Sequence, residues 1–143
     1  MTALSFTAMA ALHDASFTTP KPWSASEIEA TLASPFAFVL TDPQGFLIGR
    51  VVAGEAELLT LAVAPAARAR GIGGALVDAF LTQARARGGE SAFLEVSAAN
   101  LTAQKLYLRK GFEPQGKRKG YYQTPGGERL DALVLVRSIL IPD

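Results

Sequence analysis

The chain has 143 residues, of which 49% are hydrophobic and 19% are charged, with a formal net charge of +1. This length and composition predict one folded domain, residues 1–143, and argue against disorder and against a general nucleic-acid-binding protein, so no direct nucleic-acid partner is expected. The sequence has no cysteine and one histidine, His13, which excludes disulfides, a cysteine nucleophile and thiolate or multi-histidine metal sites. The lack of cysteine fits the reducing cytoplasm. No apolar run approaches the roughly 20 residues of a membrane span. We therefore expect a cytoplasmic protein with no metal site and no membrane contact.

The first part of the chain predicts two helices and an antiparallel meander of three strands. Helices are expected at 5–16 and 25–33, and strands at 36–41, 46–53 and 57–63. Ser24 or Ser26 is the expected N-cap of the second helix, and Pro35 ends it. The turn Asp42-Pro43-Gln44-Gly45 joins the first two strands, because proline presets φ and glycine accepts a positive φ.

The second part predicts a strand–helix–strand crossover, a further helix and a closing hairpin. Helices are expected at 72–86 and 100–110, and strands at 91–97, 112–123 and 130–140. The first of these helices has the clearest pattern, since Ile72, Leu76 and Phe80 fall on one face. The strand–helix–strand unit at 57–97 predicts a right-handed parallel crossover. The fold class is therefore α/β, with a mixed central sheet (antiparallel meander, parallel crossover and C-terminal hairpin) flanked by helices.

The stretch Arg68-Ala69-Arg70-Gly71-Ile72-Gly73-Gly74-Ala75 opens the helix at 72–86. The first amides of a helix have no intrahelical acceptor, and the helix dipole places partial positive charge there, so such a loop can bind phosphate. The alternative is a simple turn before a helix. The loop lacks the Gly-Lys-Ser/Thr of a P-loop and the G-x-G-x-x-G pattern of a dinucleotide site.

Three motifs carry a resemblance to a known family. They are Arg68-x-x-Gly71-x-Gly73 after Leu61-Ala62-Val63; Leu94-Glu95-Val96 followed by Asn100-x-x-Ala103-x-x-Leu106-Tyr107-x-x-x-Gly111-Phe112; and Tyr121-Tyr122-x-Thr124-x-x-Gly127 followed by Asp131-Ala132-Leu133. Their order and spacing resemble the GNAT superfamily of N-acetyltransferases. The third motif and Pro22-Trp23-Ser24 resemble its RimI-type branch, the ribosomal-protein-alanine N-acetyltransferases. The likeness runs from about Trp23 to Leu135. Because little chain precedes the first helix, we expect the strand that opens the fold in most relatives to be short or absent.

The resemblance implies that the phosphate belongs to acetyl-CoA, the expected co-substrate. Loop amides would hold the pyrophosphate and the strand before the loop would meet the pantetheine arm; the implied cofactor-binding residues are Leu61, Ala62, Val63, Arg68, Ala69, Arg70, Gly71, Ile72, Gly73, Gly74, Asn100 and Tyr107. Gly71 and Gly73 are expected to let the ligand approach and to take unusual φ angles. One of Arg68 and Arg70 would contact phosphate, and the other would be solvated.

The resemblance also implies two catalytic residues, Glu95 and Tyr107. Transfer requires a neutral amine, so a general base is useful. Glu95 lies within an apolar strand, where burying a carboxylate costs free energy unless the side chain faces a cleft. The alternative is a glutamate that faces solvent. Tyr107 would donate a proton to the departing thiolate; alternatively it is a core aromatic beside Phe112. Asn100 lies seven residues earlier on the same helical face, as a cofactor contact, an N-cap, or both. The oxyanion would be held by a backbone N–H near Leu61–Val63.

The acceptor side is less well specified by the sequence. Trp23, Tyr121 and Tyr122 are the candidate substrate-binding residues, with ordinary aromatic packing as the alternative, and His13 and Phe17 could border the same cleft. The basic run at 117–119 fits a solvated edge strand, or a contact with cofactor phosphate or an acidic acceptor.

Three functions remain open from the sequence. The first is transfer of acetyl to the N-terminal α-amine of a protein, such as the alanine of a ribosomal protein. The second is transfer to a small amine (a polyamine, amino acid or aminoglycoside), and the third is a non-catalytic acyl-CoA-binding module. The protein would be a monomer or a homodimer, in which the C-terminal strand could pair across the dimer.

Overall fold

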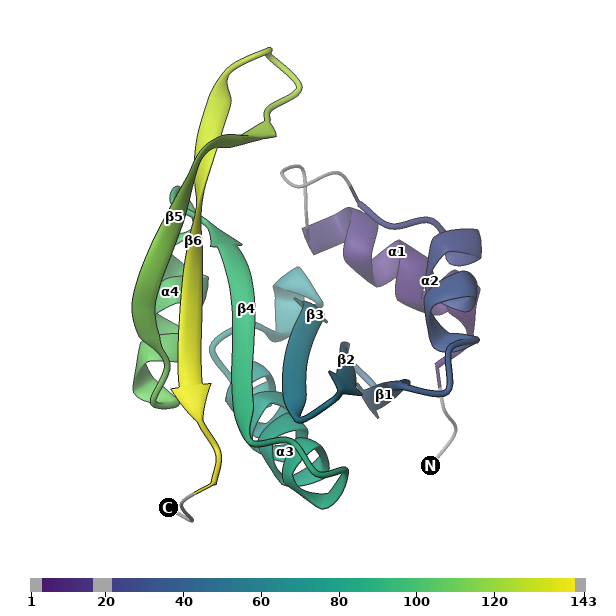
Figure 1. Cartoon of the computed structure of the whole chain (residues 1–143). Helices are drawn as coiled ribbons and strands as arrows, with labels where there is room; N and C mark the ends of the chain where they lie inside the picture. Colours follow the sequence, from purple (N-terminus) through teal and green to yellow (C-terminus); the bar gives the residue numbers. More distant parts are fainter. Residues whose placement is uncertain (1–3, 17–21, 141–143) are drawn as a thin grey trace.

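One mixed β-sheet forms the centre of the computed structural model, which describes residues 4–16 and 22–140 (Figure 1). Its strands are β1 (Ala37–Asp42), β2 (Gly45–Val52), β3 (Glu55–Val63), β4 (Ser91–Ser97), β5 (Glu113–Gln123) and β6 (Arg129–Ser138). The helices are α1 (Phe6–Ser16), α2 (Ala25–Leu32), α3 (Ile72–Ala86) and α4 (Leu101–Arg109), with a short 3-10 turn at Pro65–Ala67. The strand order is β1-β2-β3-β4-β6-β5, and only β3 and β4 are parallel. The expected fold class is therefore confirmed.

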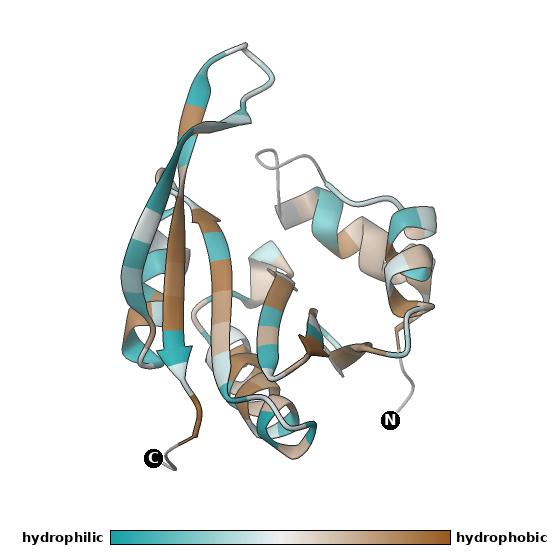
Figure 2. Cartoon of the chain, viewed as in Figure 1, coloured by the Kyte–Doolittle hydropathy of each residue, from teal (hydrophilic) through white to brown (hydrophobic). Residues whose placement is uncertain are grey.

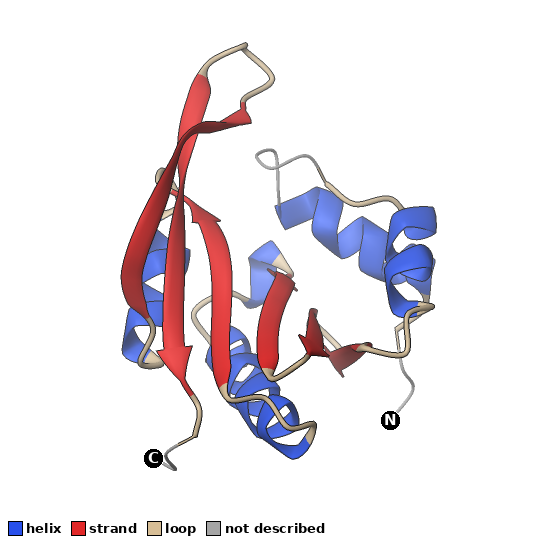
Figure 3. Ribbon diagram, in the orientation of Figure 1, coloured by secondary structure: helices blue, strands red, loops and turns tan. Residues whose placement is uncertain are grey.

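The helices cover both faces of the sheet (Figure 3). The larger core lies between the sheet and α3, where the buried stripe of that helix, including Leu76, Val77 and Phe80, packs against Leu47 and Leu94. A smaller core lies under α1 and α2, and its buried members are Met9, Ile28, Phe46, Ile48 and Ala62. None of the helices in the described ranges is long and apolar enough to cross a bilayer.

The helix ends follow the expected capping chemistry. Ser24, and not Ser26, caps α2 in a capping box: the Glu27 amide donates to Ser24 Oγ and the Ser24 amide donates to Glu27 Oε1, both at 3.1 Å. Asn100 caps α4 by accepting a hydrogen bond from the Ala103 amide at 3.1 Å. Helices α2 and α4 therefore both begin at a side-chain cap that the sequence predicted.

Strand β3 carries one residue more than its partner. Ile48 pairs with Thr60 but the next residue, Gly49, pairs with Leu58, which leaves Leu59 as the extra residue of a β-bulge. Before the bulge, Leu58 belongs to the core under α3; after it, the even-numbered Thr60 contacts His13 of α1 and Ala62 joins the core under α1 and α2. The bulge thus reverses which face the even positions occupy.

The parallel ladder between β3 and β4 is short. It contains the pairs Glu55–Ser91, Ala56–Ala92 and Glu57–Phe93, and no described residue beyond them continues it. Figure 1 shows the two strands diverging from this point. Strand β3 stays paired with β2 through Val63, and β4 stays paired with β6 through Ser97, so each strand keeps one partner while their facing edges separate.

The position of β6 corrects one expectation. The C-terminal strand lies inside the sheet, paired with β4 on one side and β5 on the other, so it cannot offer an edge to a second copy of the chain. The edge on that side is β5, which is largely hydrophilic whereas β6 is largely hydrophobic (Figure 2). Hydrophobic content along 130–140 predicted a strand but could not say where in the sheet it would lie.

Smaller differences concern element boundaries. Strand β3 begins at Glu55, two residues earlier than expected, because the turn before it is tighter and Ala53 takes a positive φ of 50°. The 3-10 turn at Pro65–Ala67 was not predicted. No strand precedes α1 among residues 4 and 5; residues 1–3 lie outside the described part of the chain.

Candidate active site

The glycine loop forms the N-terminus of α3, as the sequence predicted. Gly71 is the N-cap residue, with a φ of +79° and no side-chain cap, so the first-turn amides have no protein side chain as acceptor at the cap. Ala69, two residues earlier, also has a positive φ, of 66°. A Cβ placed on Gly71 would meet nothing within 4 Å. The amide end of the helix therefore faces open space.

Gly73 does not take the unusual φ that was expected of it, and neither it nor Gly74 has a positive φ. A Cβ on Gly73 would lie 3.2 Å from Leu106 Cδ2, so the missing side chain leaves room for Leu106 of α4. An ion pair between Lys110 and Asp78, at 2.9 Å, also joins the two helices. The glycine loop is thereby placed against the helix that carries Tyr107. The roles of Gly73 and Gly74 as cofactor contacts stay predictions.

Two arginines stand beside the loop. Arg68 and Arg70 are both exposed, one on each side of Ala69. Their charges, the helix dipole and the uncapped amides at Gly71 give a positive, open surface that fits a pyrophosphate. The contact of one of these arginines with phosphate stays a prediction.

The strand that precedes the loop presents an unpaired edge. Beyond Glu57, the side of β3 that faces β4 has no strand pairing, and this stretch includes Leu61 and Ala62. Leu61 packs against the core under α3, and Ala62 packs against the core under α1 and α2. The backbone edge of the same residues faces the gap between β3 and β4. An extended amide-containing chain such as pantetheine can add to an edge of this kind.

Tyr107 lies on α4. It is buried in the core under α3, with its ring edge-on to Phe112 at a centroid distance of 6.0 Å. Burial, followed by the nearby Tyr122, raises the pKa of the Tyr107 phenol well above its ordinary value. The phenol therefore keeps its proton at neutral pH. The core-aromatic interpretation is correct for the ring, and the catalytic role of the hydroxyl stays a prediction.

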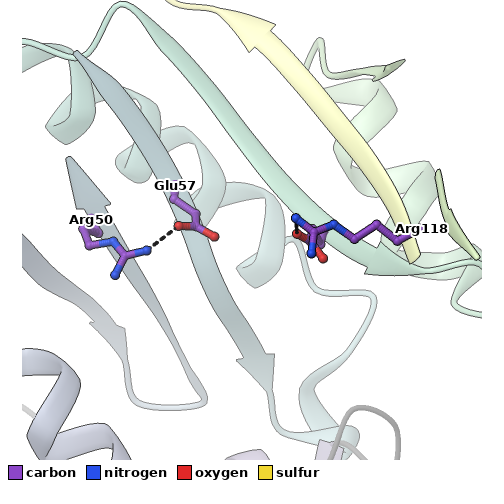
Figure 4. A network of polar contacts seen from close by, with 4 residues as sticks. Arg50, Glu57 and Arg118 are labelled. Carbon is purple, nitrogen blue, oxygen red and sulfur yellow. Dashed lines mark hydrogen bonds and ion pairs between the residues drawn. The ribbon is translucent and has the colours of Figure 1, made fainter. Parts of the chain in front are cut away.

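Glu95 lies on the opposite face of β4 from the core under α3. Its neighbours Leu94 and Val96 are buried in that core, whereas the Glu95 side chain is 22% exposed and turns toward α1 and α2. It forms an ion pair with Arg118 of β5, with 3.4 Å between Glu95 Oε1 and Arg118 Nη2 (Figure 4). Alternation along β4 explains this orientation, and the side chain is neither buried in the core nor fully exposed.

Tyr122 connects the two candidate catalytic residues. Burial, then the charge of Glu95 and then Tyr121, raises the pKa of Tyr122 to about 12, while Arg118 acts in the opposite direction. Tyr122 in turn contributes to the raised pKa of Tyr107. Tyr122 is thus within electrostatic reach of Glu95 and, separately, of Tyr107. Tyr121 packs edge-on against Tyr122 at 5.1 Å and is exposed.

His13 and Trp23 form a separate cluster. His13 is 1% exposed, so it does not border a cleft as expected. Its Nδ1 accepts a hydrogen bond from the Trp23 amide at 3.0 Å, and its Nε2 lies 2.7 Å from Thr60 Oγ1, which makes Nε2 the protonated nitrogen of the neutral ring. The rings of His13 and Trp23 lie 5.8 Å apart. Phe17, the other residue expected near the cleft, lies outside the described residues.

Burial lowers the pKa of His13 to about 4, although Glu27 offsets part of the effect. His13 therefore stays neutral near pH 7 and ties α1, β3 and the entry to α2 together. Within residues 4–16 and 22–140, no group of three or more histidine, aspartate or glutamate side chains could hold a metal ion.

Comparison with known proteins decides the family. The model of the acetyltransferase (GNAT) family matches residues 6–112. The chain belongs to the GNAT acetyltransferase family. It is an N-acetyltransferase, and its donor is acetyl-CoA.

Relatives of this GNAT chain include two bacterial enzymes named ribosomal protein bS18-alanine N-acetyltransferase. The Haemophilus ducreyi enzyme is 41% identical over 90 residues, which cover 63% of this chain and 62% of that protein. The Escherichia coli K12 enzyme is 34% identical over 122 residues, which cover 82% of each chain. The crystal structure of the ribosomal-protein-S18-alanine N-acetyltransferase from E. coli superposes with a TM-score of 0.82 and 29% identity, covering 94% of this chain and 87% of that one. The GNAT family and the likeness to the RimI-type branch are thus confirmed.

Sequence reasoning missed one residue of the site. Arg118 was grouped with Lys117 and Lys119 as part of a solvated edge strand. The available signal was that Arg118 and Tyr122 lie four residues apart on one extended strand, which puts them on one face. Their proximity to Glu95 depends on the strand order β4-β6-β5, which the sequence does not state.

Proposed function

We propose that this GNAT enzyme acetylates the N-terminal α-amine of a protein, with the terminal alanine of ribosomal protein bS18 as the leading acceptor. One observation carries the acceptor assignment: the chain is 34% identical, over 82% of both chains, to an E. coli enzyme named for that reaction. The site supports the chemistry, because it combines an open anion-binding helix end, a diverging strand pair and a carboxylate that faces away from the main core.

In this proposal Glu95 is the general base. An α-amine has a reference pKa near 8, so only about a tenth of it is neutral at pH 7. The Glu95 carboxylate is partly exposed on the face of β4 that turns toward α1 and α2, where an acceptor can reach it without displacing the core under α3. It would take the proton that the attacking nitrogen must lose.

The donor would lie on the other side of the diverging strands. Acetyl-CoA supplies the acetyl thioester. The amides from Ala69 to Gly74, with Arg68 or Arg70, would hold the pyrophosphate, and the β3 edge at Leu61–Val63 would orient the pantetheine arm and offer an N–H to the carbonyl oxygen. Asn100 already uses its side-chain oxygen to cap α4, so a contact with the cofactor would have to come in addition to that role.

Tyr107 would act at the departing sulfur. The nitrogen–carbon bond forms, the carbon–sulfur bond breaks, one amine proton passes to Glu95, and the sulfur leaves as a thiolate that accepts a hydrogen bond from the Tyr107 hydroxyl. Because burial raises the pKa of Tyr107, the phenol keeps its proton throughout. A thiol has a reference pKa near 8.5, so the hydrogen bond stabilises the thiolate without full proton transfer.

The test is a competition among acceptors. Purified enzyme is incubated with acetyl-CoA and, separately, a peptide with the bS18 N-terminus, the same peptide with a blocked N-terminus, spermidine and an aminoglycoside. Thiol release measures turnover, and mass spectrometry locates the acetyl group. We expect turnover of the free peptide alone, acetylated at its α-amine. Turnover of small amines but not of the peptide would replace this proposal with the small-amine function, and binding of CoA without any thiol release would leave the non-catalytic module.

A further inference from the structure

The ion pair between Arg118 and Glu95 crosses a strand. Arg118 of β5 pairs in the sheet with Ala132 of β6, which pairs with Ser97 of β4, so the arginine backbone lies two strands away from the strand of Glu95. Two strand spacings are about 10 Å, a gap that only a long side chain can bridge. Arg118 nevertheless brings Nη2 to 3.4 Å from Glu95 Oε1. The arginine side chain thus lies over the face of the sheet that carries the proposed base.

Arg118 has a second anchor in the same strand. Its guanidinium carbon lies 5.1 Å from the centroid of the Tyr121 ring, within cation–π range. The strand is irregular between Arg118 and Tyr122, where the Gly120 amide leaves the ladder and donates to Asp131 Oδ1 at 2.8 Å. This irregularity brings Tyr121 back beside Arg118. The guanidinium can therefore leave the carboxylate and still keep a partner.

The other charged and titratable groups near Glu95 differ from Arg118. Tyr122 is a neutral phenol at neutral pH. Tyr107 of α4 is also neutral, and the nearby group that raises its pKa is Tyr122. Glu57 of β3 shares the face of Glu95, because its sheet partner is Phe93, two residues before Glu95. Glu57 is already paired with Arg50, with 2.6 Å between Oε1 and Nη2 (Figure 4). Among the described residues, Arg118 is the cation that forms an ion pair with Glu95.

An acceptor amine needs the place that Arg118 fills. The amine must direct an N–H at a Glu95 oxygen, and in its protonated form it would also be repelled by the guanidinium. The Arg118 side chain is 55% exposed, and the pair is at the long end of ion-pair distances, so it is weak and can be displaced. We propose that Arg118 is a positioning residue that holds Glu95 in the free enzyme and gives way to the acceptor amine, thereby setting acceptor affinity and the low-pH limit of turnover.

The inference rests on the proposed role of Glu95, and its test compares Arg118→Gln with two controls. Arg118→Lys keeps the charge. Lys117→Gln removes an adjacent charge that points to the other face, where Lys117 Nζ lies 3.8 Å from Asp131 Oδ2. The measurements are the pH dependence of kcat/KM, KM for the acceptor that the enzyme turns over, and thermal unfolding as a check on folding.

For Arg118→Gln we expect the acidic limb of kcat/KM to move away from its wild-type position, because the charge beside the proposed base is removed. KM for the acceptor falls by about two- to fivefold, since the amine no longer competes with the guanidinium. Arg118→Lys stays near the wild type in its acidic limb, and Lys117→Gln changes neither quantity. High ionic strength brings the wild type closer to Arg118→Gln, because the pair is partly exposed.

Two results would overturn the inference and are distinct from each other. If Glu95→Gln abolishes the acidic limb while Arg118→Gln leaves both the limb and the acceptor KM as they are in Lys117→Gln, Arg118 has no positioning role and Glu95 remains the base. If Glu95→Gln leaves the acidic limb in place, the base assignment and the role of Arg118 fail together. If the peptide is not acetylated in the acceptor panel, the proposed acceptor is wrong. The test of Arg118 is still valid, because its kinetics are measured with whichever amine the enzyme acetylates.

Discussion

The proposed donor side and the proposed acceptor side of this enzyme are built in different ways. The donor side consists of consecutive backbone groups, from the end of β3 through the uncapped start of α3 at Gly71. The acceptor side consists of side chains from distant parts of the sequence, Glu95 on β4 with Arg118 and Tyr122 on β5, which only the strand order brings together. A contiguous motif can specify the first, whereas the second depends on the assembled sheet. Variants on the two sides should therefore change different kinetic quantities.

The largest effect is expected on the acceptor side at Glu95. Glu95→Gln keeps the shape of the side chain but removes the base, so kcat/KM should fall by about 10²- to 10⁴-fold and its acidic limb should disappear. The dissociation constant of acetyl-CoA should stay within about twofold of the wild-type value, measured by calorimetry. A comparable loss of acetyl-CoA binding would show that the two sides are not separable at this residue.

Tyr107 lies between the two sides and should affect turnover without affecting donor binding. Tyr107→Phe keeps the ring against Phe112 and removes the hydroxyl, so kcat should fall by about 10²-fold, as expected for one lost hydrogen bond to a developing negative charge. Acetyl-CoA affinity and thermal stability serve as controls and should change little. Unchanged kcat would exclude Tyr107 from the reaction.

On the donor side, the matched pair Gly71→Val and Gly88→Val separates ligand binding from backbone strain. Both glycines flank α3 and have positive φ angles, of 79° and 85°. A Cβ added to either one would meet no heavy atom within 4 Å beyond its chain neighbours. Both variants should therefore lose similar stability, of about 1–3 kcal/mol. Only Gly71→Val should raise the dissociation constant of acetyl-CoA, by about tenfold, because only Gly71 faces the expected pyrophosphate. Equal affinities in the two variants would contradict the assignment of the loop.

The smallest effect is expected at His13, which supports the acceptor side without entering it. His13→Gln can still donate toward Thr60 but loses the acceptor of the Trp23 amide, so the free energy of unfolding should fall by about 1 kcal/mol at pH 7. The pKa of His13 is about 4 in the folded protein against 6.5 in the unfolded chain. The unfolded chain therefore binds more protons between these values, and wild-type stability should fall as the pH drops from about 6.5 to 4.

Chemical denaturation at several pH values measures both effects. The pH dependence in this window should be weaker in His13→Gln than in the wild type, because the variant has lost the titrating group. Equal slopes for the two proteins would show that another group dominates. Activity at pH 7 should stay close to the wild-type value.

The contrast between the two sides also explains how much the sequence could predict. Helix α3, strand β4 and the Gly71 loop follow from local patterns: a periodic apolar face, alternation around Glu95 and an uncapped glycine start. The assignment of Glu95 and Tyr107 as catalytic came from the resemblance and stays a prediction. For the helix, the strand and the loop, the relevant information is local in the sequence.

What the sequence could not predict depends on long-range geometry. Gly73 was expected to take an unusual φ, but it has an ordinary one, and Leu106 of α4 lies where its side chain would be. His13 was expected to border a cleft, but it is buried and contacts Thr60 and Trp23. Arg118 was interpreted as one of three solvated cations, but it forms an ion pair with Glu95. In each case a contact between residues that are distant in the sequence decides the environment of the side chain.

The extra residue at Leu59 has a consequence for how the family should be aligned and altered. Strand β3 serves two cores with one stretch of chain, and Leu59 is the residue that the pairing with β2 does not need. Deleting Leu59 would remove the bulge and restore regular alternation, since Leu58 and Thr60 already face opposite cores. Thr60 would still face His13, and Leu61 and Ala62 would keep the cores that they now join. A one-residue gap at Leu59 in an alignment is therefore expected where the bulge is absent, and positions beyond the gap should be matched by the face that they occupy.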